Sequence, residues 1–194
     1  NAHRKDLHMP ADMKNIIGEA FVKMVARKGI DKITVKSLIE ECHISRQTFY
    51  YHFQDIMDVL EWCVRQETNT LVKESLKAED LQTALQIFIS FNTEHFSWFQ
   101  KLMDSHRRAQ IETLLVDAVK TYMIEMSRHS HSDLYVNYED MDVLLQFNAC
   151  GLVGVLLEYG KTSKTSPKDP EKLSRQLEQI ISGQLLHLSP DSKR

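Results

Sequence analysis

The chain has 194 residues, of which 42% are hydrophobic and 26% charged, and its formal net charge is −3 at pH 7. This is an ordinary soluble composition, and the length suffices for a small domain beside a larger one with its own core. No apolar run approaches the roughly 18 to 20 residues of a membrane span and no secretory signal is recognised, so we expect a cytoplasmic protein without a membrane partner. Three cysteines without any CxxC spacing favour reduced thiols over a disulfide or zinc site.

The first expected helix covers residues 10 to 28. Apolar side chains recur along one face of it, and Gly29 follows as a stop signal. Residues 1 to 53 carry nine Lys and Arg against six Asp and Glu, a net charge of +3, whereas the rest of the chain carries −6. The positive charge therefore lies in the N-terminal part, which suits a protein that meets phosphates with that part alone.

The segment Ile33–Leu60 predicts two short helices joined by a tight turn, the outline of a helix-turn-helix. Thr34 is a candidate N-cap for the first helix and Ser45 for the second. Ile44, just before Ser45, and Phe49, four residues after it, have the spacing of a hydrophobic staple. Such a staple fixes the angle at which the second helix leaves the turn.

With its two phenylalanines turned inward, the second helix points its remaining i,i+4 pairs outward. This outward surface has an arginine, a glutamine, a threonine, two tyrosines and a histidine but no acidic side chain. Such a surface suits the edge of a DNA groove.

The same residues resemble the TetR family of bacterial transcriptional regulators. The family pattern is matched by Thr34-Val35, Ile44-Ser45, Thr48-Phe49-Tyr50 and His52-Phe53, with spacing and residue types agreeing together. Three positions depart from the pattern. His43 replaces the usual turn glycine, which is tolerable because His visits positive φ more readily than most residues. Ile39 replaces a usual alanine, and Ile56 stands where the family commonly has a phosphate-contacting lysine.

The resemblance implies an all-α fold: a three-helix helix-turn-helix DNA-binding domain over residues 3–55, then a helical effector-binding and dimerisation domain over 56–188. Apolar periodicity and polar breaks predict the later helices, with no competing strand pattern. They are expected at about 54–77, 80–92, 95–104, 107–128, 139–160 and 170–188.

The last two expected helices have more apolar surface than a small monomer needs, and Gly151 and Gly154 would let another helix approach the first of them. An intramolecular core and a contact with a second copy would explain these residues equally well. In TetR-like proteins the two helices pair with their copies in a four-helix interface, so the resemblance implies a homodimer. The residues expected there are Leu145, Val153, Leu156, Leu177, Ile181 and Leu185.

The middle of the chain is rich in aromatic and methionine side chains, which at helical spacing form either plain core or a ligand pocket. The resemblance implies a pocket, and a weaker one to regulators of the dihydroxyacetone kinase operon admits a signal carried by a partner protein instead of a direct small-molecule effector. No cofactor and no metal site are predicted, since His129 and His131 stand in a polar loop without further ligands. The pocket residues expected are His95, Trp98, Phe99, Met103, His106, Tyr122, Met126 and Gln146.

The sequence contains no GxSxG, no Gly-rich phosphate loop and no HExxH, so an enzyme is not expected. It favours a dimeric, sequence-specific regulator, on family grounds a repressor, that binds double-stranded DNA at a palindromic operator. The alternative is a helical adaptor or coactivator without a direct ligand, which would leave the surface of the second helix without a role. Arg46 and Gln47 are expected at base edges. The full set of expected DNA contacts is Thr34, Lys36, Ser45, Arg46, Gln47, Thr48, Tyr50, Tyr51 and His52.

Overall fold

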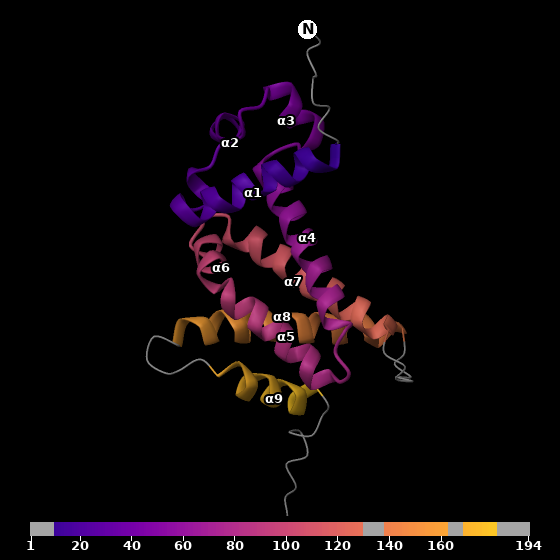
Figure 1. Ribbon diagram of the computed structural model, residues 1–194. Coiled ribbons are helices and arrows are strands. Elements are labelled where there is room, and N and C mark those ends of the chain that lie inside the picture. Colours follow the sequence, from indigo (N-terminus) through magenta and orange to yellow (C-terminus); the bar gives the residue numbers. More distant parts are fainter. Residues whose placement is uncertain (1–9, 130–137, 163–168, 182–194) are drawn as a thin grey trace, which may run out of the picture. The chain divides into compact units, whose positions relative to one another are not determined.

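The computed structural model describes residues 10–129, 138–162 and 169–181, and all regular structure in these ranges is helical (Figure 1). This confirms the predicted all-α class. The predicted residues 182–188 of the last helix lie outside the described part of the chain. The helices are α1 (Pro10–Lys28), the 3-10 turn η1 (Ile30–Lys32), α2 (Val35–Cys42), α3 (Arg46–His52), α4 (Ile56–Ser75), α5 (Leu81–Glu94), α6 (Phe96–Met103), α7 (Arg108–His129), α8 (Tyr138–Thr162) and α9 (Pro170–Ile181).

The chain forms two compact units, and no single cut separates them. The first unit contains residues 1–67 and 97–115, and the second contains residues 68–96 and 116–194. The expected domains, 3–55 and 56–188, would divide the chain at one point. The compact units divide it differently because α4 and α7 are long enough to contribute residues to both units.

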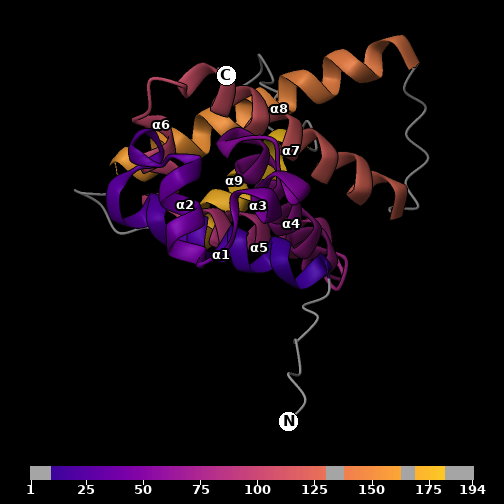
Figure 2. The same ribbon diagram turned by 90° about the horizontal axis from the view of Figure 1, so that it is seen from above.

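The first unit is built on the three N-terminal helices, which cross one another around a shared core (Figure 2). Phe21 of α1, Leu38 of α2 and Phe49 of α3 are fully buried in this core. A Cβ added to Gly18 would lie 2.6 Å from the ring of Trp62, so the glycine allows α1 and α4 to approach closely. Helix α3 has only seven residues, too few to be stable alone, so tertiary packing holds it in place.

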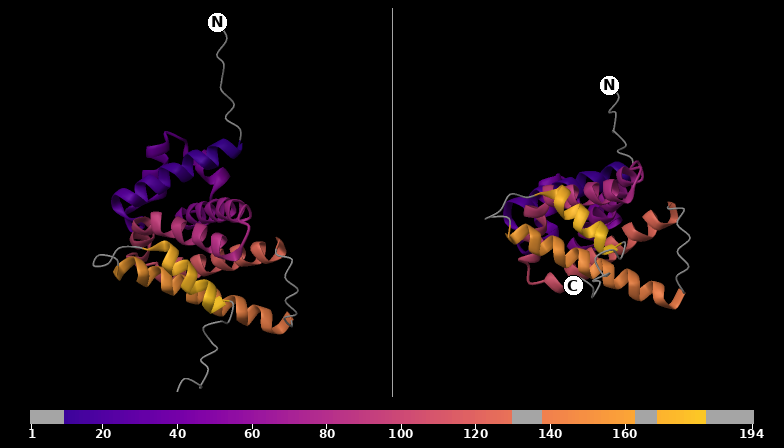
Figure 3. Two further views of the ribbon diagram at one scale, coloured as in Figure 1. Left: turned by 60° about the horizontal axis from the view of Figure 1, so that its bottom comes forward. Right: turned by 90° about the horizontal axis from the view of Figure 1, so that it is seen from below.

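The second unit packs α5 against α9 and, over a shorter stretch, against α8 (Figure 3). Phe88 of α5 lies with its ring centroid 4.9 Å from that of Tyr122 on α7. The buried Tyr122 hydroxyl donates a hydrogen bond to Ser75 Oγ at 2.9 Å. α9 adds Leu173 and Leu177 to the interior. This apolar set forms the core of the second unit.

Helix α8 is apolar on more than one side. Its stretch Met141–Tyr159 is long and apolar enough to cross a membrane by length and composition, which corrects the expectation that no such run exists. Ala149, Leu152 and Val153 are buried, whereas Val143 and Phe147 are exposed. One such helix is weak evidence for a membrane span, and a helix with one face in the core and another against a second protein surface has the same composition.

Candidate nucleic-acid interface

The first turn of α2 is fixed by a reciprocal cap at Thr34. Thr34 Oγ1 accepts the Ser37 backbone N–H at 3.1 Å, and Ser37 Oγ accepts the Thr34 backbone N–H at 3.0 Å. The Thr34 hydroxyl hydrogen remains available to an outside acceptor. Lys36 follows in the same turn with an almost fully exposed side chain, and its nearest carboxylate is Glu40 at 3.9 Å. An exposed pair at that distance is weak, so the Lys36 ammonium can meet a phosphate.

The turn between α2 and α3 depends on a left-handed residue. His43 has φ 53° and ψ 40°. Its backbone N–H donates to the Glu40 carbonyl at 3.3 Å, and the Ile44 N–H donates to the Ile39 carbonyl at 3.2 Å. The departure from the family's glycine therefore leaves the turn intact, as expected for a residue that tolerates positive φ.

Helix α3 begins at Ser45, whose side chain is the N-cap. Ser45 Oγ accepts the Thr48 backbone N–H at 3.0 Å, and the two hydroxyl oxygens lie 2.8 Å apart. One hydroxyl donates to the other, which leaves a single hydroxyl hydrogen for an outside acceptor. Phe49 is fully buried below the helix, while Tyr50 and Tyr51 are exposed at 48% and 77%. The predicted division of α3 into an inward and an outward face is confirmed.

Aromatic side chains support the polar groups on the outward face. The Arg46 guanidinium lies over the Tyr50 ring, 5.6 Å from its centroid. A cation–π contact of this kind restricts the guanidinium without occupying its five N–H donors. Tyr51 and His52 meet edge to face at 4.9 Å. Arg46 is therefore held close to the helix surface, and no hydrogen bond from the described residues occupies its donors.

At the C-terminal end of α3, His52 is half-buried beside Lys14 of α1. Desolvation and the positive charge of Lys14 lower the pKa of His52 below its usual 6.5. The imidazole is accordingly neutral at pH 7 and offers one N–H donor. Lys14 reaches the same place, with its Nζ 5.1 Å from the centroid of the Phe53 ring. Sequence reasoning missed Lys14, because nothing in the spacing along the chain relates it to α3.

The residues predicted to contact DNA lie together on the first turn of α2 and along α3, in one compact unit. The predicted pocket residues do not share a unit. Those in the first unit are Trp98, Phe99, Met103 and His106, and those in the second are His95, Tyr122, Met126 and Gln146.

Several of these pocket candidates already have structural partners. Tyr122 bonds to Ser75, His95 Nδ1 lies 2.9 Å from the Phe91 carbonyl, and Gln146 Oε1 accepts the Lys120 ammonium at 3.1 Å. Trp98 Nε1 is buried without a hydrogen-bond partner among the described residues. The pocket therefore stays a prediction.

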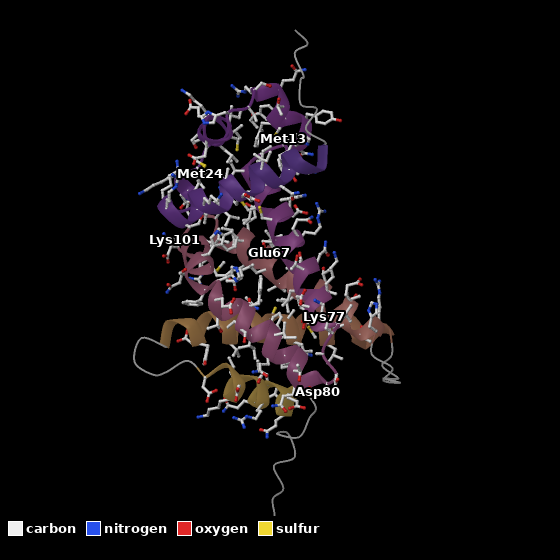
Figure 4. The ribbon with its side chains drawn as sticks, in the orientation of Figure 1. Met13, Met24, Glu67, Lys77, Asp80 and Lys101 are labelled. Carbon is white, nitrogen blue, oxygen red and sulfur yellow. The ribbon has the colours of Figure 1, made fainter. Side chains whose placement is uncertain are left out.

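His106, another pocket candidate, takes part in a contact that sequence reasoning missed. Asp31 of η1 accepts the Ser105 hydroxyl at 2.6 Å and the His106 backbone N–H at 3.1 Å, and His106 Nδ1 lies 2.8 Å from the same carboxylate. The Ser105 hydrogen bond, with the backbone N–H and charge of His106, lowers the Asp31 pKa. Nearby, Lys101 on α6 donates to the Ala26 carbonyl of α1 (Figure 4). These bonds join α6 and the turn that follows it to α1 and η1.

The predicted dimer residues divide between interior and surface. Val153 and Leu177 are only 6% and 5% exposed, so both are part of the core of their own chain. Leu145 and Leu156 are half-buried. Leu185 lies outside the described residues, as does the side chain of Ile181. The apolar periodicity from which Val153 and Leu177 were predicted belongs to buried helix faces. For Leu177 the reason is that the apolar face of α9 packs against α5.

Comparisons with known proteins agree with this geometry. The family of bacterial regulatory proteins named tetR matches residues 17–61, and a transcriptional regulator C-terminal region of the TetR type matches residues 79–183. The HTH-type dhaKLM operon transcriptional activator DhaS of Lactococcus lactis is 20% identical over 172 residues, which are 89% of this chain and 90% of that protein.

Solved structures show the same fold. One described as the dihydroxyacetone kinase operon activator DhaS has a TM-score of 0.62 at 19% identity, covering 89% of this chain and 96% of its own. A TetR transcriptional regulator from Streptococcus agalactiae has a TM-score of 0.63 at 16% identity, covering 89% and 94%. Because the C-terminal match alone spans more than half of the residues and the N-terminal match covers the helix-turn-helix, the chain belongs to the TetR family of DNA-binding, non-enzymatic transcriptional regulators.

Proposed function

We propose that this regulator binds a two-fold symmetric operator as a homodimer, with α3 of each copy in the major groove. The observation that carries the proposal is the outward face of α3, which presents arginine, glutamine and tyrosine side chains and no carboxylate. A face of this kind can approach the phosphate backbone without repulsion while its polar ends reach base edges.

Base reading falls to the first turn of α3. Arg46 can donate two hydrogen bonds to the O6 and N7 of a guanine, and Gln47 can pair with the N6 and N7 of an adenine. Tyr50 holds the Arg46 guanidinium and lies next to it on the exposed surface, so it contacts a base or a phosphate. Each good bidentate contact discriminates against the wrong base by about 1 to 3 kcal/mol.

Backbone contacts are assigned to the groups around this turn. Lys36 supplies an exposed ammonium, and the hydroxyls of Thr34 and of the Ser45–Thr48 pair each retain a hydrogen for a phosphate oxygen. Tyr51 and His52 extend the same surface toward the end of α3. These contacts fix the register of the helix on the duplex and are independent of base sequence.

TetR-family regulators act as dimers, and we assign the dimer contact to the exposed face of α8. Val143 and Phe147 are exposed at 70% and 75% in the single chain, with Leu144 and Val155 beside them. Gly151 and Gly154 have no atom within 4 Å of the position where a Cβ would lie, so a partner helix can approach the backbone there. This face lies on the other side of α8 from the buried Val153 and replaces it in the proposed interface.

The direction of regulation stays a prediction. A dimer seated on a promoter represses by excluding polymerase, and on family grounds repression is our assignment. The similar protein DhaS is described as an activator. In vitro transcription from the bound promoter, with and without the protein, distinguishes the two: lower transcript supports repression and higher transcript overturns it.

The proposed signal is a small-molecule effector or a partner protein that carries one, and the proposed place of action is the nucleoid in the cytoplasm. A signal received by the second unit lowers operator affinity if the two α3 helices can no longer meet both half-sites together. The adaptor alternative needs no DNA at all.

The direct test of the proposed function is capture of genomic fragments by the purified chain, followed by titration of the enriched fragment at several salt concentrations. We expect one enriched palindromic site, bound with an affinity that falls steeply with salt. Absence of any salt-sensitive DNA binding would favour the adaptor.

A further inference from the structure

Between the end of α3 and the first turn of α4, residues 53–59, this chain has no lysine or arginine. Ile56, at the position where TetR-like sequences commonly have lysine, is only 7% exposed and packs into the core. The first turn of α4 is instead capped by carboxylates: Asp55 Oδ1 accepts the Met57 and Asp58 backbone N–H groups at 2.7 and 2.9 Å. Asp58 Oδ2 accepts the Gln54 N–H at 2.8 Å. This turn is therefore negatively charged.

Lys14 supplies a positive charge at the same end of α3 from a different helix. Its Nζ lies over the Phe53 ring, at the residue that caps the C-terminus of α3, and its charge acts on the neighbouring His52. Figure 4 shows the position of its neighbour Met13 on the stretch of α1 beside α3. In the described part of the chain Lys14 forms no ion pair, whereas Lys23 on the same helix approaches Glu19 at 3.8 Å. Among the described residues, the Lys14 ammonium therefore has no carboxylate partner.

We propose that Lys14 binds a DNA phosphate beside the C-terminal end of α3, so that α1 contributes a backbone contact to the operator complex. Phe53 positions the ammonium through its ring face, which attracts a cation without neutralising it. Because the Lys14 side chain is already half-buried, it loses little conformational entropy when it binds the phosphate. The inference rests on the proposed seating of α3 in the major groove.

Counterion release predicts how much the loss of Lys14 changes the salt dependence of DNA affinity. Each neutralised phosphate contributes about 0.9 to the slope of log affinity against log salt concentration. A dimer on its operator carries Lys14 twice, so Lys14→Gln should reduce the slope by about 1.8. If the variant and the unmodified protein bind equally at 1 M salt, this difference in slope makes the variant's affinity roughly 60-fold lower at 0.1 M. Specific and non-specific DNA should both show this loss.

The test compares four variants of the full chain by fluorescence anisotropy on one labelled operator at four salt concentrations. Lys14→Gln and Lys14→Met, the second of which keeps an apolar contact with Phe53, should lose slope equally. Lys14→Arg should retain it, and Lys23→Gln on the same helix should match the unmodified protein. An unchanged slope in both neutral variants would overturn the inference, as would a loss in Lys14→Arg equal to that in Lys14→Gln.

A measurement on the unmodified protein guards against variants that fold poorly. Lysine acetylation mapped by mass spectrometry, with and without operator DNA, should show Lys14 protected by DNA and Lys23 modified equally in both. Equal modification of Lys14 with and without DNA overturns the inference. If the protein gives no salt-sensitive DNA binding, the proposed function fails. If the protein binds DNA, and Arg46→Ala weakens that binding while Lys14→Gln leaves it unchanged, only the proposed Lys14 contact fails.

Discussion

Phe147 on α8 gives the sharpest test of how two copies meet. Complete burial of a phenylalanine stabilises by about 1.5 to 3 kcal/mol. Phe147 is 75% exposed in the single chain, so covering it contributes about 1 to 2 kcal/mol per copy and about 2 to 4 kcal/mol per dimer, because a two-fold interface presents it twice. Phe147→Glu should therefore weaken dimerisation by at least about 30-fold to 1,000-fold, with carboxylate desolvation adding to the loss.

Sedimentation velocity over a range of concentrations measures this dissociation, and circular dichroism reports folding. We expect Phe147→Glu to remain helical while it sediments as a monomer, because Phe147 contributes little to the core of its own chain. Val22→Glu, which changes an exposed apolar residue of α1, is the matched control and should stay dimeric. Leu177→Glu is a poor test, since Leu177 is buried and a charge there should unfold the second unit. A Phe147→Glu chain that dimerises with unchanged affinity would place the interface elsewhere.

Two further predictions concern the first unit. His43→Gly should raise the free energy of unfolding by up to about 1 kcal/mol, since glycine takes the left-handed conformation without steric strain, and His43→Val should lower it; urea denaturation showing the reverse order would contradict the account of the turn. Asp31 has a lowered pKa in the folded state, so its stabilisation is fully present above the unfolded value near 3.8 and is lost as pH falls through the folded pKa. Asp31→Asn should therefore be less stable than the unmodified chain at pH 6 and nearly equal to it below the folded pKa, whereas an equal difference at both pH values would remove the carboxylate from that role.

The sequence predicted the helices well because their limits are local. Pro10 begins α1 and Gly29 ends it, and the capping side chains of Thr34 and Ser45 lie where the sequence predicted them. The outward face of α3 followed from the same periodicity, since burying Phe49 leaves Arg46 and Tyr50 on the opposite side. Local chemistry was enough to locate the DNA-binding surface.

The dimer face and the long-range contacts depend on which helices pack together, and local sequence patterns do not specify that packing. Helix α8 is apolar on both faces, so periodicity could not distinguish the inward Val153 from the outward Phe147. The Asp31–Ser105 contact spans 74 positions, and no spacing rule relates the two residues. The same holds for Lys14 and Phe53, which meet only after α1 has packed beside α3.

Substitution of Arg46 by alanine tests most directly whether α3 reads bases. Affinities of the unmodified and Arg46→Ala dimers should be measured for the captured operator and for operators with each base pair of one half-site replaced. We expect a loss of about 1 to 3 kcal/mol per half-site on the operator and relaxed preference at one base pair, because a bidentate guanine contact disappears. Lys36→Ala should instead weaken all sequences alike and lower the salt slope by about one unit per half-site. An Arg46→Ala dimer that discriminates among all these sequences as the unmodified protein does would contradict the account.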